Sequence, residues 1–287
     1  MGLVQGLTEL FPVSSLGHGV LVPALLGWHN LVSSQTQTES FFLVVLVAMH
    51  VGTALGLLLY FRRTWLQLLA GLARQLRRTP ETGVGALWRL RDPALDPHYR
   101  LLVLLALGSI PVGLVGLTLQ SKLRELFAKP LATCVFLIVN GLILMLGEWL
   151  RRSRGRHART VRVTSLSAGR TLGIGSSEVL ALLAGISRSG VTMAAGLAGG
   201  LDHEGAANFS FLLATPVILL AGLDKVPALF GPLGDGVRTQ ALVGALVALV
   251  AAYAATRFLT RWFQTRTLTP FAVYCVVVGA LCAARFA

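Results

Sequence analysis

Six runs of about 20 mainly apolar residues dominate the chain, and each is long enough to cross the hydrocarbon core of a bilayer as a helix. Hydrophobic residues make up 54% of the 287 residues and charged residues only 13%, where soluble domains carry about 25%. This composition excludes a water-soluble enzyme and a disordered chain, and it predicts an all-α integral membrane protein with six spans. The expected spans are Phe41–Phe61, Leu101–Leu119, Leu131–Leu150, Ala206–Leu223, Thr239–Leu259 and Leu268–Phe286.

Basic residues cluster beside these runs. Of the 25 Lys and Arg residues, 18 lie in Arg62–Arg100, Arg151–Arg170 and Arg257–Arg266. Such clustering is the positive-inside bias of membrane proteins, so we assign these segments to the cytoplasm. The segment Trp28–Ser40, which has no Lys or Arg, is assigned to the outside, and both termini then lie outside. The net charge of +13 therefore reflects topology, and no nucleic-acid partner is expected.

Two further apolar regions, Met1–Trp28 and Thr171–Leu201, are each interrupted near the middle. The polar breaks lie at Pro12–His18 and at Ala184–Gly190. Irregular backbone at membrane depth is tolerated only where protein or a water-filled cavity satisfies its N–H and C=O groups. We therefore predict two re-entrant helix–loop–helix hairpins that face each other.

The two hairpins predict an inverted repeat within one membrane domain, residues 1–287. Each half, roughly 1–150 and 171–287, has one hairpin and three spans, and a basic cytoplasmic loop, 151–170, joins them. Because three is an odd number, the halves enter the membrane in opposite directions. A shift of 173 residues aligns positions 5–17 with 178–190, with four identities: Leu7/Leu180, Leu10/Leu183, Ser14/Ser187 and Gly17/Gly190.

Ionisable residues inside a membrane are costly and are functional candidates by default. The hairpins contain Glu9, His18, Glu178 and Arg188. They also contain short hydroxyl side chains and glycines, which bring backbone N–H groups close to a ligand. This set suits a phosphate or diphosphate, with Arg as a clamp, a carboxylate for a cation or water, and His for proton transfer. The hydroxyls are Ser14, Ser15, Ser187, Ser189 and Thr192, and the glycines are Gly17, Gly185 and Gly190.

Each candidate also has a structural interpretation. Hairpin hydroxyls can merely satisfy freed backbone carbonyls, and Glu9 with Arg188 can form an ion pair that only holds the hairpins together. We expect His50 to be a packed polar residue and Glu148 to be an interfacial anchor. We expect Asp202–Glu204 to form a solvated turn.

The segments Gln5–His18 (QGLTELFPVSSLGH) and Gly185–Thr192 (GISRSGVT) resemble the two signature motifs of the bacterial undecaprenyl-diphosphate phosphatase family, also called bacitracin-resistance proteins. Motif order, separation and span count extend the resemblance over nearly the whole chain. The resemblance implies an enzyme of the bacterial inner membrane that hydrolyses undecaprenyl diphosphate to the monophosphate carrier of cell-wall synthesis. It also implies dependence on a divalent cation, Mg²⁺ or Ca²⁺, and a site open to the periplasm. Bacitracin would compete for the lipid substrate and would not bind the protein.

The resemblance also implies roles for individual residues. Glu9 would handle metal or water, and Ser15 or His18 would act as nucleophile or acid/base. Arg188 would hold the diphosphate, and which group attacks phosphorus stays open. The substrate-binding residues would be Gln5, Ser14, Gly17, Ser187, Ser189, Gly190 and Thr192.

The chain departs from the family pattern at Ala184, where the second motif usually has a proline, and at two positions that the repeat aligns with each other. Gln5 stands where the first motif opens with glutamate, and Glu178 stands where a glutamine precedes the second motif. Our hypothesis is that Glu178 supplies the carboxylate that Gln5 lacks, so that Glu9 and Glu178 are the metal ligands. The alternative is that the missing acid marks a weakened or repurposed enzyme.

Two rival functions stay open. Inverted repeats with broken helices are also a transporter layout, so a polyprenyl-phosphate transporter or flippase without phosphatase activity is the alternative. An enzyme for another lipid phosphate would share every motif. The segment Arg63–Arg78 is either an interfacial amphipathic helix or a plain loop helix. Membrane lipids are expected partners, and a homodimer is left open.

Overall fold

The computed structural model describes residues 1–28, 41–83, 95–127, 129–154, 160–225, 227–231 and 235–287, with residues 85, 90 and 92. Within these residues the regular structure is helical and contains no strand, as the composition predicts. The outer loop expected at Trp28–Ser40 lies outside the described residues from residue 29 onward, and so do residues 155–159 of the basic loop.

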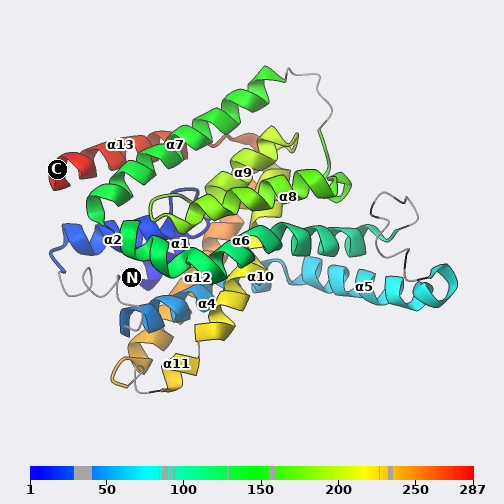
Figure 1. Ribbon diagram of the computed structural model, residues 1–287, viewed down its shortest axis with the longest axis horizontal. Coiled ribbons are helices and arrows are strands. Elements are labelled where there is room, and N and C mark those ends of the chain that lie inside the picture. Colours follow the sequence, from blue (N-terminus) through cyan, green and yellow to red (C-terminus); the bar gives the residue numbers. More distant parts are fainter. Residues whose placement is uncertain are drawn as a thin grey trace.

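The helices follow the order that the hydropathy pattern predicts (Figure 1). The first half contains α1 (Gly2–Thr8), α2 (Ser15–Leu25), α4 (Phe41–Tyr60), α5 (Arg62–Thr82), α6 (Pro97–Phe127) and α7 (Pro130–Ser153). The second half contains η2 (Val163–Ser165), α8 (Ala168–Ser177), η3 (Glu178–Leu182), α9 (Arg188–Ala198), α10 (His203–Lys225), α11 (Pro227–Phe230), α12 (Arg238–Thr265) and α13 (Thr269–Phe286).

All six expected spans form helices, but they differ in how well they suit a bilayer. In the described part of the chain, four helices are long and apolar enough to cross a membrane: Pro97–Leu119, Pro130–Ser153, Arg238–Thr265 and Thr269–Phe286. A fifth span exists if α4 and α5, which meet at an angle of 76°, are counted together. The expected span Ala206–Leu223 lies within α10. The chain is thus a multi-pass membrane protein, and its span number and orientation stay predictions.

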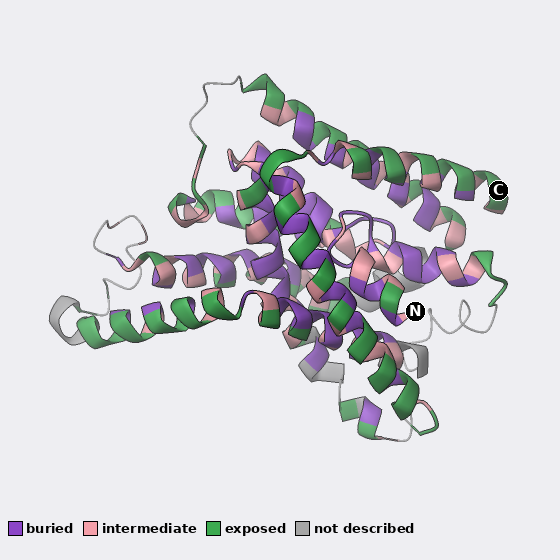
Figure 2. Cartoon of the chain, turned by 180° about the vertical axis from the view of Figure 1, so that it is seen from behind, coloured by how far each residue is buried: buried purple, intermediate pink, exposed green. Residues whose placement is uncertain are grey.

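The outer surface is apolar where a membrane would contact it. Along α13, Val273, Val277 and Leu281 recur every fourth residue and are 46–68% exposed, so they form one outward stripe. Leu246 and Val250 of α12 are similarly exposed. Figure 2 shows these exposed faces around a buried centre. Large exposed apolar faces are unfavourable in water and indicate lipid contact.

Glycines allow the hairpin helices to pack closely against long helices. A Cβ atom at Gly2 of α1 would lie 2.5 Å from the carbonyl oxygen of Gly244 in α12. A Cβ atom at Gly175 of α8 would lie 2.0 Å from the carbonyl oxygen of Gly108 in α6. Real Cβ atoms do not come so close, so glycine is required at both positions. Gly2 and Gly175 are separated by 173 residues, and their contacts therefore follow the predicted repeat alignment.

The start of α6 is held by Asp96. Its Oδ1 accepts backbone N–H groups from His98 at 2.9 Å and Tyr99 at 3.2 Å, and Arg74 Nε of α5 donates to its Oδ2 at 2.8 Å. Burial alone would raise the pKa of Asp96, but Arg74 and the backbone donors stabilise the ionised form, and the net effect lowers the pKa below its ordinary value. The residue thus caps α6 and ties it to α5.

Replacing this cap should reduce stability in a pH-dependent way. We expect Asp96→Ala to lower the free energy of unfolding by about 1 kcal/mol at pH 7, as loss of an N-cap does. The folded-state pKa is depressed, so the ionic part of this contribution is present above the ordinary aspartate pKa and is lost as pH falls through the folded-state value. Thermal unfolding in detergent at pH 7 and in acid measures this. A difference from wild type that does not shrink in acid would contradict the ionic contribution.

Candidate active site

The two predicted breaks lie together near the middle of the molecule (Figure 1). Each break begins and ends a few residues earlier than the sequence predicts: the first separates α1 from α2, which begins at Ser15, and the second precedes α9, which begins at Arg188. The physical reason is that Ser14 and Ser187 are N-caps, so the polar residues after them already belong to helices.

The capping serines occupy equivalent positions. Ser14 Oγ accepts the backbone N–H of Gly17 at 3.1 Å, and Ser187 Oγ accepts that of Gly190 at 3.1 Å. Both pairs match the shift of 173 residues. Ser14 Oγ also accepts the N–H of Gly185 at 3.2 Å, which joins the two hairpins. Ser14 Oγ therefore has a structural role, but it accepts backbone N–H groups and does not satisfy freed carbonyls as the structural interpretation expected.

The carboxylate of Glu9 is the centre of the site, and its side chain is only 5% exposed. Its Oε2 accepts Ser15 Oγ at 2.5 Å and Gln5 Nε2 at 2.7 Å. Its Oε1 accepts Arg188 Nη2, which forms the ion pair considered from the sequence. The structure therefore brings together four predicted site residues from both hairpins.

His50 belongs to this cluster, contrary to our expectation of a packed polar residue. Its Nε2 lies 3.4 Å from Glu9 Oε2, and its Nδ1 lies 2.8 Å from the carbonyl oxygen of Leu46. Since a carbonyl only accepts, Nδ1 carries the proton. The sequence signal was present, because His50 is an ionisable residue in an apolar run, but nothing local shows that α4 passes beside Glu9.

Asn140 of α7 is a second residue that the sequence analysis missed. It is fully buried. Its Nδ2 donates to the Pro12 carbonyl at 3.0 Å, and its Oδ1 accepts the Ser187 N–H at 2.9 Å. One amide side chain thus satisfies backbone groups in both breaks, as irregular backbone at membrane depth requires.

Removing this amide should disorder the site. We expect Asn140→Ala to leave two buried backbone groups unpartnered, at about 1–3 kcal/mol each, and to lower both thermal stability and activity. Thr133→Ala is the matched control, since Thr133 Oγ1 lies on the same helix and has no hydrogen-bond partner among the described residues. Unfolding in detergent measures the effect; equal stability of both variants would refute the bridging role.

His18 lies at the edge of the site and does not join the Glu9 cluster. Its Nδ1 lies 2.8 Å from the Ser14 carbonyl oxygen, and its Nε2 lies 2.8 Å from the Tyr274 hydroxyl of α13. The two rings are nearly parallel, at 10°. Tyr274 is 256 residues away in sequence and was not a candidate.

The remaining predicted residues line the same junction. Ser189 Oγ lies 3.0 Å from Ser187 Oγ and donates to the Phe11 carbonyl at 3.4 Å, which fits the structural interpretation of this hydroxyl. Thr192 Oγ1 donates to the Arg188 carbonyl at 2.7 Å. A Cβ atom at Gly17 would lie 3.1 Å from Gly185 Cα, so glycine permits the close approach of the two breaks.

Glu178 is fully buried near this junction. Its Oε1 lies 3.2 Å from Thr192 Oγ1, which shares its one hydroxyl proton with the nearer Arg188 carbonyl, and its Oε2 has no hydrogen-bond partner in the described part of the chain. Arg188 interacts electrostatically with both Glu178 and Glu9. Gln5, which the repeat aligns with Glu178, donates directly to Glu9. The exchange of acid and amide between Gln5 and Glu178 therefore stays a hypothesis. Glu178 Oε2, which has no hydrogen-bond partner among the described residues, is the oxygen that would bind a cation or water.

Two substitutions test the exchange. If Glu178 supplies the acid, Glu178→Gln should lose at least about tenfold in activity, which corresponds to 1.4 kcal/mol, while Gln5→Glu alone should give no gain. Glutamine preserves size and the contact with Thr192, so folding should be retained. The assay for both variants is lipid-phosphate hydrolysis in detergent. An active Glu178→Gln enzyme would refute the hypothesis that Glu178 supplies the missing carboxylate.

Glu148 and the expected solvated turn Asp202–Glu204 differ from expectation. Glu148 is buried and is not an interfacial anchor: its Oε1 accepts His203 Nε2 and the Leu268 N–H, each at 2.7 Å. His203 is therefore a buried link between helices, while Asp202 caps α10 through Gly205 N–H at 2.7 Å.

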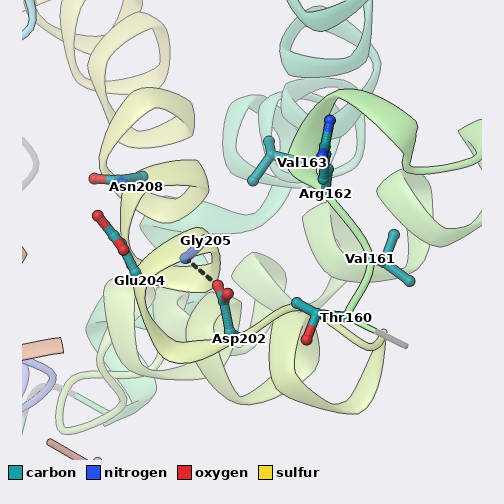
Figure 3. A pocket seen from close by; sticks show the side chains of 8 residues that line it. All are labelled: Thr160, Val161, Arg162, Val163, Asp202, Glu204, Gly205 and Asn208. Atoms are coloured by element: carbon teal, nitrogen blue, oxygen red, sulfur yellow. Dashed lines mark hydrogen bonds between the residues drawn. The ribbon is translucent and has the colours of Figure 1, made fainter. Parts of the chain in front are cut away.

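Nearby is a hollow of about 240 Å³, and no predicted catalytic residue lines it (Figure 3). Its lining is Thr160, Val161, Arg162, Val163, Asp202, Glu204, Gly205 and Asn208.

The donors of the site fit a divalent cation only in part. Among the described residues, no three His, Cys, Asp or Glu side chains come together. Glu9 offers one carboxylate, and Glu178 has a buried oxygen without a partner. Mg²⁺ is commonly held by one or two carboxylates together with substrate phosphates. The residues therefore fit a cation whose other ligands come from a diphosphate.

The arrangement suits an anion that carries phosphate. Ser15 and Arg188 are the first residues of α2 and α9, and both contact Glu9. Two helix N-termini therefore converge here, and helix N-termini attract anions. A hydroxyl beside a carboxylate and a guanidinium supplies nucleophile, base and phosphate ligand. The fold is that of a helical multi-pass membrane protein, and the groups at the junction of its hairpins have the chemistry that a phosphorylated ligand requires.

Comparison with known proteins is consistent with this class. The family model "Bacitracin resistance protein BacA" matches residues 1–281, so the chain belongs to that family. It is 48% identical to an undecaprenyl-diphosphatase of Mycolicibacterium paratuberculosis, with 97% of this chain and 93% of the relative covered. It is 45% identical to undecaprenyl-diphosphatase 2 of Frankia alni, with 100% and 96% covered. A third relative, undecaprenyl-diphosphatase 2 of Chromobacterium violaceum, is 43% identical, with 97% and 94% covered.

Proposed function

We propose that this protein hydrolyses undecaprenyl diphosphate to undecaprenyl phosphate and inorganic phosphate, and so confers bacitracin resistance. The observation that carries the proposal is the contact of Ser15 and Arg188 with the buried carboxylate of Glu9, at two converging helix N-termini. The names and near-complete coverage of the relatives support it. The alternative of a transporter needs no nucleophile beside a base.

The geometry supports Ser15 as the attacking group. Its hydroxyl already donates to Glu9 Oε2 at 2.5 Å, the relation of a nucleophile to its general base. Ser15 Oγ would attack the terminal phosphorus as its proton passes to Glu9, and undecaprenyl phosphate would leave. Glu9 would return this proton to the departing lipid phosphate and become a carboxylate again. A water molecule would then attack the phosphorus bound to Ser15 while Glu9 takes its proton, and Glu9 would pass that proton to Ser15 Oγ as inorganic phosphate leaves.

Arg188 would stabilise the charge that spreads over the transferred phosphoryl group. Its guanidinium, 17% exposed, is held by Glu9 and points into the junction of the hairpins. Desolvation strengthens its interaction with an anion. The N-termini of α2 and α9 would add backbone donors for the phosphate oxygens.

A divalent cation, Mg²⁺ or Ca²⁺, would be held by Glu9, with Glu178 as the second candidate ligand. When bound, such an ion neutralises phosphate charge and polarises the phosphorus centre. The residues of the chain still perform the proton transfers described above.

The proposed surroundings of the site rest on what the family resemblance implies. The polyprenyl tail would lie in the bacterial inner membrane, with the diphosphate between the hairpins and the site open to the periplasm. Bacitracin would act by competing for this lipid and not by binding the protein. Membrane lipids would be its other partners.

Phosphate release from undecaprenyl diphosphate in detergent micelles tests the proposal. We expect release with Mg²⁺ and none with EDTA, and a loss of about 10²–10³-fold in Arg188→Ala, as for one preorganised donor. Glu9→Gln should lose at least as much, because it removes the base. Glu204→Gln, a carboxylate change in the hollow of Figure 3, is the matched control and should retain activity.

Well-folded wild-type protein that binds the lipid without releasing phosphate would refute the enzyme and favour the transporter. Phosphate release that EDTA does not affect would refute the requirement for a divalent cation but not the phosphatase activity.

A further inference from the structure

Ser14, the residue before the nucleophile of the proposed function, has an unfavourable backbone conformation. Its φ is +69° and its ψ is 104°, the one positive φ outside glycine in the described residues. Such conformations are sparsely populated for residues other than glycine and persist only where neighbouring groups hold them. The peptide orientation at Ser14 sets the direction of the next residue, Ser15, whose hydroxyl meets Glu9.

The carbonyl of Ser14 is held by two donors. It accepts the backbone N–H of His18 at 3.1 Å and the Nδ1 of the same residue at 2.8 Å. Because a carbonyl can only accept, Nδ1 must carry a proton. In the neutral ring Nε2 then has a lone pair, and the Tyr274 hydroxyl, 2.8 Å away, is its donor.

The second half of the molecule lacks this arrangement. Ser187 is the equivalent cap, but its φ is an ordinary −89°. The residue equivalent to His18 is Val191, which has no side-chain donor. The strained serine and the histidine–tyrosine pair thus occur together in one half only.

We propose that Tyr274 and His18 are positioning residues for this reaction: they hold the strained Ser14 peptide and thereby aim Ser15 at Glu9. This inference rests on the proposed function for its kinetic readout. In this role His18 is a fixed hydrogen-bond donor at Nδ1 and transfers no proton to substrate. Tyr274 acts from α13, outside both hairpins.

The first test compares Tyr274→Phe with wild type in phosphate release. Loss of one hydrogen bond, about 1 kcal/mol, should lower kcat roughly fivefold and leave KM unchanged, since the lipid contacts are intact. The same change in a His18→Ala background should have no further effect. Tyr60→Phe is the matched control: its hydroxyl contacts Thr260 at 2.7 Å, and kcat should not change.

The second test separates positioning from acid/base chemistry. His18→Asn places an amide N–H near the former Nδ1 but cannot exchange protons, so it should retain much more activity than His18→Ala. Equal loss in both variants would overturn the positioning role, and so would wild-type kcat in Tyr274→Phe.

A readout without catalysis distinguishes failure of the inference from failure of the proposed function. In protein labelled with ¹⁵N at histidine, His18 should show a protonated Nδ1 and an unprotonated Nε2, and Tyr274→Phe should perturb its Nε2 signal. An inactive wild type with this pattern would refute the phosphatase and not the hydrogen-bonded pair. An Nε2-protonated neutral His18 would refute the pair itself.

Discussion

The structure depends on the stabilisation of one buried charge. A carboxylate removed from water is strongly unfavourable unless donors and a cation surround it. Glu9 meets that requirement with contacts from four helices or their flanks: Gln5 in α1, Ser15 in α2, His50 in α4 and Arg188 in α9. Because these elements come from both halves, the charge orients the hairpins toward each other, and the same donors form the site.

The breaks in the apolar regions serve this arrangement. Each break ends in a serine cap, and each cap accepts a backbone N–H from the first turn of the helix that follows. Asn140 satisfies one backbone group of each break, and Ser14 joins them through Gly185. Polar satisfaction and anion recognition therefore use the same groups. Because these side chains satisfy the backbone N–H and C=O groups of both breaks, irregular backbone persists among apolar helices.

Much of the site could be predicted from the sequence, because ionisable residues inside apolar regions are few. Glu9 and Arg188 were predicted on that ground and Ser15 as a hydroxyl at the polar break, and both Ser15 and Arg188 contact Glu9 in the structure. His50 carried the same signal but was assigned to packing. Asn140 and Tyr274 carried none, since single polar residues in apolar helices commonly have local partners. Their partners lie 47 to 256 residues away.

The sequence by itself determined the helical class, the two interrupted regions and the chemical groups placed there. Hydropathy and capping act over one or two helical turns, so these properties are local. Only the tertiary structure decided which side chains surround Glu9, that Glu148 is buried, and that Tyr274 faces His18. The physical reason is that these contacts depend on the rotation and register of packed helices, which close glycine contacts and interdigitating side chains set across the whole fold.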